Sequence, residues 1–282
     1  ADARNGRAVA NVYAAKARPD FNPLIVHVAD LSAADEIGVV TPRAADLAAR
    51  FWPGPLTLVL DRRPAAGIAD LVTAGLPRVA LRVPAHPVAQ AVLQAFGGPV
   101  AAPSANRSGR ISPTTADHVR AGLGQQVDAV LDAGPCAVGV ESTILSLEGE
   151  RVRLLREGGL PREVFDFPVS LADADAPMTA PGQLASHYAP RAALVMDSAL
   201  DDPAAVRIGF GKGPVADFNL SESGDLVAAA ARLFSVLHQA DDLARSQHRT
   251  IAVAPIPETG LGRAINDRLR RAAAPRPAPP ES

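Results

Sequence analysis

A short basic segment near the start of the chain contains residue types that bind phosphates. In "KARPDFNPL", Lys16 and Arg18 are separated by one residue and are followed by Asn22. Alternate residues of an extended segment face the same side, so the two cations can point together. Lys16 and Lys212 are the only lysines, and this bias toward arginine indicates that Lys16 is kept for its compact ammonium group. The segment predicts a polyphosphate site, with a charged helix end before a proline turn as the alternative.

A second polar segment, "VAAPSANRSGRISPT", spans residues 100–114 directly after an apolar run. Ser104 and Asn106 are expected on a loop that leaves a buried strand, and Ser112 followed by proline is expected to open a helix. Such loops bind phosphates in α/β proteins, because unpaired N–H groups and the helix dipole both favour anions. An ordinary capped connection between a strand and a helix is the alternative.

A strand with two arginines is the third candidate. In "RVALRVP" the period of two places Arg78, Ala80 and Arg82 on one side and the apolar residues on the other. A strand arginine commonly clamps a ligand carboxylate. A solvated strand face is the alternative.

Three further side chains are weaker candidates. Ser142 begins the strand in "GVESTILS", and Arg156 precedes the glycine pair in "LLREGG". His27 lies inside an apolar strand, where a satisfied core histidine is the commoner outcome. The later segment "GFGKG" lacks the spacing of a P-loop or of a dinucleotide fingerprint and is expected to be a turn.

Helices and strands alternate along the chain and must position these residues. Helices are expected over residues 5–16, 41–52, 86–98 and 112–123, strands over 22–29, 55–63, 78–84, 99–103 and 128–134, and a hairpin over 142–159. After a stretch rich in Pro, Ala and Asp, strands are expected over 192–197, 207–211 and 250–256, and helices over 226–243 and up to 273. The pattern predicts an α/β fold with a mixed sheet and a second, smaller α/β domain. The expected domains are 1–168 and 191–272, with a linker over 169–190 and a disordered tail over 273–282.

Composition limits the classes of function. The net charge of -2 argues against a broad surface for long nucleic acid, so phosphate binding should be local. Cys136 is the only cysteine and the six histidines lack metal-site spacing, so no metal site is expected within the protein. No apolar run approaches the roughly 18 residues of a membrane span, and no leader opens the chain. A cytoplasmic protein without membrane contact is expected.

Seven blocks together resemble the YrdC-type threonylcarbamoyl-AMP synthases in the long form that carries a C-terminal domain. The blocks are "KARPDFNPLIVH", "FWPGPLTLVL", "RVALRVPAHP", "APSANRSGRISPT", "GVESTIL", "LLREGG" and "SHYAP". The resemblance implies a YrdC-like twisted mixed sheet with helices, plus a smaller Rossmann-like α/β C-terminal domain. It also implies a nucleotidyltransferase that joins L-threonine, bicarbonate and ATP, with Mg²⁺, into threonylcarbamoyl-AMP and pyrophosphate. The product would pass to a threonylcarbamoyl transferase complex for tRNA modification, with no stable nucleic-acid complex of its own.

The resemblance also implies roles for individual residues. Lys16 and Arg18 would act catalytically on the phosphates. The implied ATP-binding residues are Arg18, Asn22, Arg78, Ser104, Asn106, Ser112, Arg156 and Tyr188, of which Tyr188 would close over the nucleotide from the linker. The implied threonine-binding residues are His27, Arg82, Ser142 and the backbone at Ala102, with Arg82 on the threonine carboxylate.

One block of the family has no counterpart in the chain. Family members open with a strand that carries a "PTETVYGLG"-like motif, whereas this chain starts at "ADARNGRAVA". We therefore expect an N-terminal truncation, with a sheet strand missing and the threonine site partly opened.

Two other functions remain as alternatives. A non-catalytic RNA-binding module would bind duplex RNA in a strongly salt-dependent way, without competition from ATP. A carbamoyl-transferring maturation enzyme shares the Lys-x-Arg and Ser-x-Asn pairs, but normally brings zinc-finger cysteines that this chain lacks.

Overall fold

The computed structural model describes residues 1–149, 151–171, 180–182 and 184–275. These residues form two compact units. Unit 1 comprises Ala1–Ser104 and Glu141–Gln183, and unit 2 comprises Ala105–Val140 and Leu184–Ser282. Residues 105–140 therefore cluster with unit 2, although the sequence placed them in the first domain. In the expected linker, residues 172–179 and 183 lie outside the described residues, as do residues 276–282 of the expected tail.

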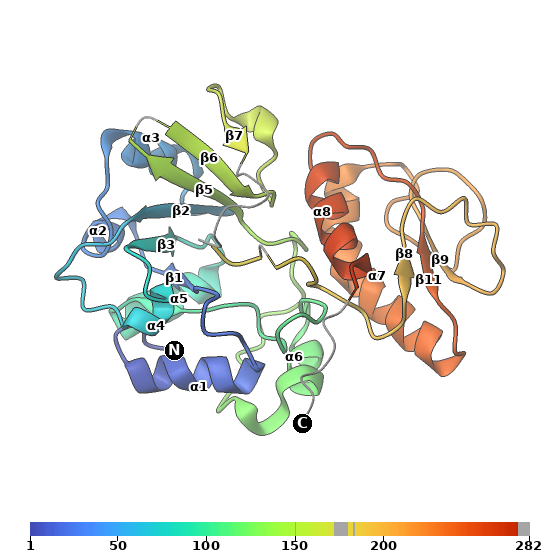
Figure 1. Cartoon of the computed structure of the whole chain (residues 1–282), viewed down its shortest axis with the longest axis horizontal. Helices are drawn as coiled ribbons and strands as arrows, with labels where there is room; N and C mark the ends of the chain where they lie inside the picture. Colours follow the sequence, from blue (N-terminus) through green and yellow to red (C-terminus); the bar gives the residue numbers. More distant parts are fainter. Residues whose placement is uncertain (150, 172–179, 183, 276–282) are drawn as a thin grey trace. The chain divides into compact units, whose positions relative to one another are not determined.

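Unit 1 is built on a seven-stranded mixed sheet (Figure 1). Its strands are β1 (Ile25–His27), β2 (Leu56–Asp61), β3 (Arg78–Arg82), β4 (Val100–Ala101), β5 (Thr143–Glu148), β6 (Arg151–Arg156) and β7 (Ser170–Leu171). They lie in the order β4-β1-β3-β2-β5-β6-β7. Strand β1 is parallel to β3 and antiparallel to β4, and β2 is antiparallel to β3 and parallel to β5. The expected mixed sheet and the expected β5–β6 hairpin are confirmed.

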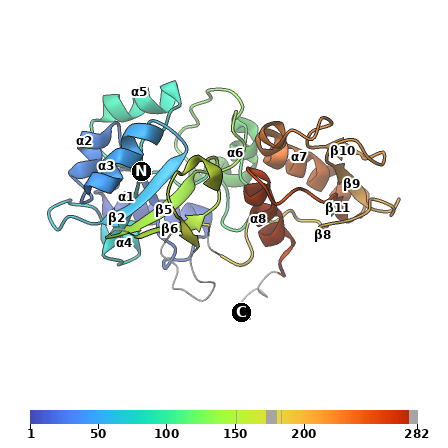
Figure 2. The same ribbon diagram turned by 90° about the horizontal axis from the view of Figure 1, so that it is seen from above.

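Five α-helices accompany this sheet (Figures 1 and 2). They are α1 (Gly6–Lys16), α2 (Leu31–Asp35), α3 (Pro42–Phe51), α4 (Asp70–Thr73) and α5 (Pro87–Phe96), and a short 3-10 helix, η2, covers Arg162–Val164. The side chain of Asn5 accepts the Ala8 N–H and so caps α1, as the sequence predicts. Helix α1 ends at Lys16, so the C-terminal end of this helix positions the lysine ammonium group.

The two faces of the seven-stranded sheet differ in character. The main core contains Val26, Leu58 and Leu81 together with side chains of α1 to α4, so those helices cover this face. A smaller apolar cluster contains Ile25, Val59, Ala80 and Ile144, which alternate with the core residues. We call the face that bears this smaller cluster the polar face, because strand alternation also places several candidate site residues on it.

Unit 2 contains a four-stranded parallel sheet in the order β10-β9-β11-β8. Its elements are α6 (Ala116–Leu123), η1 (Gly124–Gln126), β8 (Leu194–Val195), β9 (Val206–Gly209), β10 (Phe218–Asn219), α7 (Leu226–Ser246), β11 (Ile251–Val253) and α8 (Gly262–Ala273). Leu233, Phe234 and Leu237 of α7 are buried against Val206 and Ile251 of the sheet. The second α/β fold is confirmed.

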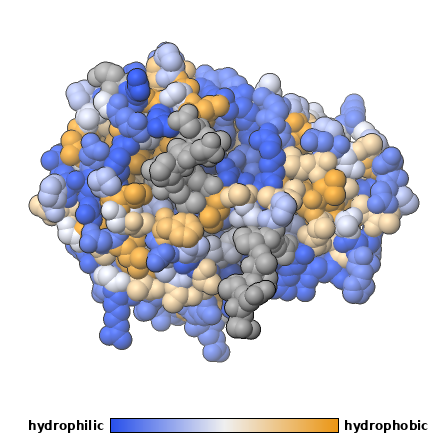
Figure 3. All heavy atoms as spheres, viewed as in Figure 1, coloured by the Kyte–Doolittle hydropathy of each residue, from blue (hydrophilic) through white to orange (hydrophobic). Residues whose placement is uncertain are grey.

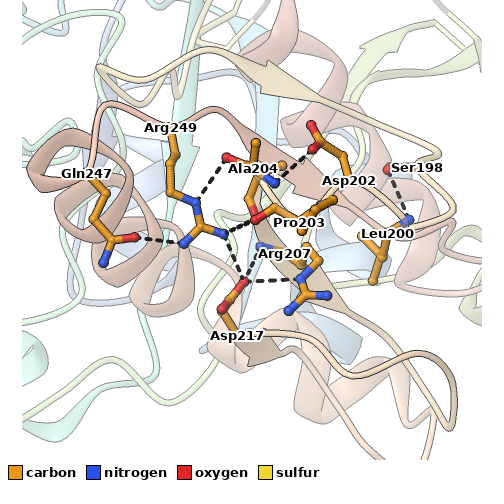
Figure 4. Close-up of polar contacts among 10 residues, drawn as sticks. Ser198, Leu200, Asp202, Pro203, Ala204, Arg207, Asp217, Gln247 and Arg249 are labelled. Atoms are coloured by element: carbon orange, nitrogen blue, oxygen red, sulfur yellow. Dashed lines mark hydrogen bonds and ion pairs between the residues drawn. The ribbon is translucent and has the colours of Figure 1, made fainter.

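The partly buried Arg249 connects several loops of unit 2 through hydrogen bonds (Figure 4). Arg249 donates from Nε to the Ala204 carbonyl at 3.0 Å and from Nη1 to Gln247 at 2.7 Å. Its Nη2 lies 3.9 Å from Asp217, whose carboxylate accepts the Arg207 N–H at 2.8 Å. These contacts fix the β8–β9 connection and the β9–β10 connection to the start of β11.

Two sequence predictions in residues 112–134 are wrong. Residues 128–134 form no strand, and Leu131 is 68% exposed, so its apolar run packs against no partner strand. The helix expected from Ser112 begins instead at Ala116, because Thr115 provides the cap and accepts the His118 N–H at 3.2 Å.

The exposed surface carries apolar residues at scattered positions. Val215 is 83% exposed, and Figure 3 shows polar and apolar residues interleaved over the face it draws. None of the helices in the described parts of the chain combines the length and the apolar character needed to cross a bilayer.

Candidate functional site

Lys16 is a buried cation at the end of α1. Its side chain is 3% exposed, and its Nζ donates to the carbonyl oxygen of Ser104. Burial, with a smaller effect from the charge of Arg18, lowers the pKa of Lys16 to about 7. Lys16 and Ser104, 88 residues apart in sequence, therefore meet in unit 1. Near neutral pH a fraction of Lys16 is therefore the neutral amine, which takes up a proton when an anion binds beside it.

Arg18 is fixed by the loop that follows α1. Its Nε donates to the Asn22 carbonyl at 3.0 Å, and its Nη2 donates to Asn22 Oδ1 and to the Pro23 carbonyl, each at 2.7 Å. The Tyr13 hydroxyl donates to the same Asn22 carbonyl at 2.8 Å. Arg18 and Asn22 are thus brought together, and the guanidinium is held rigidly beside Lys16.

His27 and Arg82 are direct neighbours on the parallel strands β1 and β3. Both lie on the polar face. Burial, with an added effect from Arg82, lowers the pKa of His27 to about 3, so the imidazole is neutral. Ala102, just past β4, donates its N–H to the Ile25 carbonyl at 3.2 Å, which places its backbone beside β1.

Arg82 has an unused guanidinium fork. Its Nε donates to the Gly54 carbonyl at 3.0 Å, and its two Nη groups make no hydrogen bond to the described residues. Burial, followed by the positive charge of Arg156, lowers the pKa of Arg82 to about 10, which leaves it charged at neutral pH. A partly buried cation with free planar donors suits a carboxylate.

Ser142 and Arg156 form a buried pair at the start of β5 and the end of β6. Arg156 donates from Nε and Nη2 to the Ser142 carbonyl at 3.0 and 2.8 Å, and from Nη2 to the Ser142 hydroxyl at 3.1 Å. That hydroxyl also lies 2.7 Å from Thr57 Oγ1. Thr57 is fully buried on β2 and was not among the candidates, although it lies in the "FWPGPLTLVL" block.

Arg78 stands apart from these groups on the same strand as Arg82. Its Nε donates to Asp61 at 3.1 Å, its Nη1 to Ser146 at 2.5 Å, and its Nη2 to the Val59 and Leu147 carbonyls. All three nitrogens are therefore engaged within the sheet. These contacts argue for a structural role, and a contact of Arg78 with nucleotide stays a prediction.

Asn106, Ser112 and Tyr188 belong to unit 2. Asn106 Nδ2 donates to the Arg107 carbonyl at 3.0 Å and to the Arg110 carbonyl at 2.9 Å, which braces the loop. Ser112 is 4% exposed. Tyr188 is 1% exposed and stacks on Phe234 at 5.4 Å, so its ring is part of the unit 2 core. The roles of these three residues at a nucleotide stay predictions.

The described residues of unit 1 thus provide two groups of candidates. One contains Lys16, Arg18, Asn22 and Ser104, and the other contains His27, Arg82, Ser142 and Arg156. Four of these candidates are basic, namely Lys16, Arg18, Arg82 and Arg156, and their summed potential favours anionic ligands.

Sequence comparison decides which family this arrangement belongs to. The profile of the Sua5/YciO/YrdC family, described as "Telomere recombination", matches residues 1–158. The chain belongs to this family. Residues 154–274 match the threonylcarbamoyl-AMP synthase C-terminal domain, so the chain has the long, two-domain form of the family that the seven blocks indicated.

Relatives and solved structures agree over almost the whole chain. A threonylcarbamoyl-AMP synthase of Bacillus subtilis (strain 168) is 38% identical over 299 residues, which cover 97% of this chain and 85% of that protein. The synthase of Pyrococcus abyssi is 35% identical over 297 residues, covering 96% and 86%. A crystal structure of P. abyssi Sua5 complexed with L-threonine has a TM-score of 0.87, with 32% identity over 97% of this chain and 86% of that one. A variant of P. abyssi Sua5, with an adjacent His and Tyr changed to alanine, has a TM-score of 0.86 over 97% and 85%.

Proposed function

We propose that this protein joins L-threonine, bicarbonate and ATP into threonylcarbamoyl-AMP with release of pyrophosphate. The observation that carries the proposal is the buried ammonium of Lys16, held beside Arg18 and against the Ser104 carbonyl in a chain of this family. A desolvated cation at a rigid position stabilises charge that develops on a phosphoryl group.

The chemistry of the transfer asks for cations and needs no nucleophilic side chain. A carbamate oxygen of N-carboxythreonine attacks the α-phosphorus of ATP. The new O–P bond forms as the bond from the α-phosphorus to the bridging oxygen breaks, and pyrophosphate leaves with the bonding electrons. Charge increases on the phosphoryl oxygens and on the leaving group, where Lys16 and Arg18 would stabilise it.

We divide the candidates between the two organic substrates as the family resemblance implies, so Arg156 is assigned to the nucleotide although it contacts Ser142. Lys16, Arg18, Asn22, Ser104 and Arg156 of unit 1 would bind the nucleotide. For Asn106, Ser112 and Tyr188, which belong to unit 2, nucleotide binding stays an expectation from the family resemblance. His27, Arg82, Ser142 and the backbone at Ala102 would bind threonine. The free fork of Arg82 supports a bidentate contact with the threonine carboxylate.

The proposal also covers the metal ion, the fate of the product and the location of the protein in the cell. No cluster of three His, Cys, Asp or Glu side chains suited to a metal occurs among the described residues. We therefore propose that Mg²⁺ enters with the phosphates of ATP, as part of the substrate. The product would be consumed by a threonylcarbamoyl transferase complex that acts on tRNA. A cytoplasmic location is consistent with the single cysteine.

The direct test is a turnover assay with labelled bicarbonate. We expect a labelled adenylate, and one equivalent of pyrophosphate, that both require L-threonine. Omitting threonine, or replacing it with alanine, is the control. Pyrophosphate release that does not depend on threonine, or RNA binding without any adenylate, would refute the proposal.

Binding of ATP should be accompanied by proton uptake at Lys16. The free protein holds the pKa of Lys16 at about 7, and contact with phosphates favours the charged form, so the pKa rises in the complex. Uptake should be small at about pH 6, where Lys16 is already protonated, and should approach one proton at about pH 8. Affinity for ATP should fall as the pH rises through this window. Calorimetry in two buffers of different ionisation enthalpy measures the uptake, which should disappear in Lys16→Met.

Thr57 should act as a positioning residue through the Ser142 hydroxyl. Thr57→Val removes the 2.7 Å contact with almost no change in volume. We expect a loss of about 1–3 kcal/mol in the free energy of unfolding. The KM for threonine should rise several-fold while the KM for ATP stays close to wild type. Ser142→Ala and the double variant complete a cycle, and additive effects on the threonine KM would contradict a role through Ser142.

A further inference from the structure

A cavity of about 570 Å³ lies within unit 2, and Lys16, Arg18 and Ser104 belong to unit 1. Helix α6, helix α7, the loop that follows Asn106 and the segment at Arg191 line it. We call it the α6–α7 cavity. Its volume falls in the range of about 300–1,000 Å³ typical of small-molecule sites. The side chains that matter for its chemistry are Arg107, Arg110, Arg191, Arg245, His118 and His238.

The charges that line the α6–α7 cavity are mainly positive. The side chains of Arg107 and Arg191 form no hydrogen bond or ion pair with the described residues. The two acidic side chains are already engaged. Asp241 is 8% exposed and accepts the Ala192 N–H at 2.8 Å, and Asp242 lies 3.9 Å from Arg245. The guanidinium groups of Arg107 and Arg191, which come from separate segments, thus line one space without an acidic partner among the described residues.

Two stacked histidines form part of the wall of this cavity. The rings of His118 and His238 are 3.8 Å apart at an angle of 23°. His118 Nδ1 accepts the Thr114 N–H at 3.3 Å, and His238 Nε2 lies 3.2 Å from the Ser112 carbonyl, to which it donates. Because Nδ1 of His118 accepts, that ring is neutral with its proton on Nε2, whereas His238 carries a proton on Nε2. The two stacked rings thus add a polar, aromatic surface to a cavity that is also lined by arginines.

We propose that the α6–α7 cavity is a second anion site that binds a small phosphorylated molecule. Guanidinium forks match the geometry of phosphate oxygens and bind them through paired, charge-assisted hydrogen bonds. Asn106 supports this site by bracing the carbonyls of Arg107 and Arg110, because its Nδ2 donates to both. The loop therefore presents its arginines on a rigid backbone.

Binding of a phosphate dianion at this site should be linked to protonation of the histidine pair. Burial lowers the pKa of both His118 and His238, so the pair is neutral in the free protein at neutral pH. The nearby Asp117, Asp241 and Asp242 oppose this effect, and the stacked rings accept a second proton poorly. A bound phosphate dianion favours the protonated form of the pair, so binding and proton uptake are linked.

The test uses inorganic phosphate as the probe and the full chain as the protein. Calorimetry should detect a phosphate site that is weakened at least about tenfold in an Arg191→Gln and Arg245→Gln double variant. Arg232→Gln, an exposed arginine on the same helix α7, is the matched control and should bind phosphate as wild type does. All three substituted arginines are exposed, and an unchanged melting temperature verifies the fold.

Histidine NMR separates this site from the nucleotide site. Phosphate should shift the ring signals of His118 and His238 but not that of His86 in unit 1. The shifts should persist in Lys16→Met, which disables the proposed catalytic site. Shifts that vanish in Lys16→Met would overturn the proposal, because the cavity would then belong to the nucleotide site. Equal phosphate affinity in all variants, or binding of RNA without binding of phosphate, would also overturn it.

Discussion

Replacing Lys16 with methionine should lower turnover by about 10²–10³-fold and leave the protein at least as stable as wild type. Methionine matches the length of the lysine side chain and is apolar. The wild-type side chain is 3% exposed, and burial lowers its pKa to about 7, so holding the charge in the folded state costs free energy. The variant removes that cost together with one hydrogen bond to the Ser104 carbonyl. Pyrophosphate release and thermal unfolding, measured on the same sample, check both parts.

Lys212 provides a matched control, because it is the only other lysine and lies exposed in the β9–β10 connection. Lys212→Met should keep full activity. If Lys16→Met turned over at the wild-type rate, Lys16 would have no part in the transfer. If it unfolded at a much lower temperature, the role of Lys16 would be structural instead.

Helix capping and strand periodicity, which depend on neighbouring residues only, predicted the helices and strands that position the site. Asn5 and the Thr41–Pro42 pair begin their helices as expected, because a capping side chain needs only the backbone next to it. The period of two in β3 correctly placed Val79 and Leu81 in the main core, with Ala80 on the opposite face.

The same reasoning failed where an apolar run has no partner. Residues 128–134 have the composition of a strand but pair with none of the described strands, and Leu131 remains exposed. Strand pairing depends on distant residues, so composition alone does not decide it. Tyr188 shows the same limit, since its burial against Phe234 depends on residues far along the chain.

Contacts within the site also lay beyond sequence reasoning. Thr57 and Ser142 are 85 residues apart, and their hydroxyl contact follows from the parallel pairing of β2 with β5. Likewise, sequence alone could not separate Arg78 from Arg82, which have the same residue type, strand and face. Only their acceptors distinguish them, because Arg78 uses all three nitrogens within the sheet and Arg82 uses one.

That difference predicts opposite outcomes for two matched substitutions on one strand. Arg82→Gln should raise the KM for threonine by about 100-fold, since a bidentate contact with a carboxylate is lost. Its stability should stay close to wild type, because only the Gly54 contact disappears and the repulsion between Arg82 and Arg156 is relieved. Threonine binding by calorimetry, with thermal unfolding alongside, measures both quantities.

Arg78→Gln should show the reverse pattern. Its bonds to Asp61, Ser146 and two carbonyls disappear, and leaving those partly buried acceptors without donors should cost about 3 kcal/mol of unfolding free energy. The KM for threonine should change by less than about twofold, which corresponds to under about 0.4 kcal/mol. A large rise in the KM for ATP at unchanged stability would instead place Arg78 on the nucleotide. Equal effects of the two substitutions on threonine affinity would refute the assignment of Arg82 to the threonine carboxylate, because the free fork would then carry no special function.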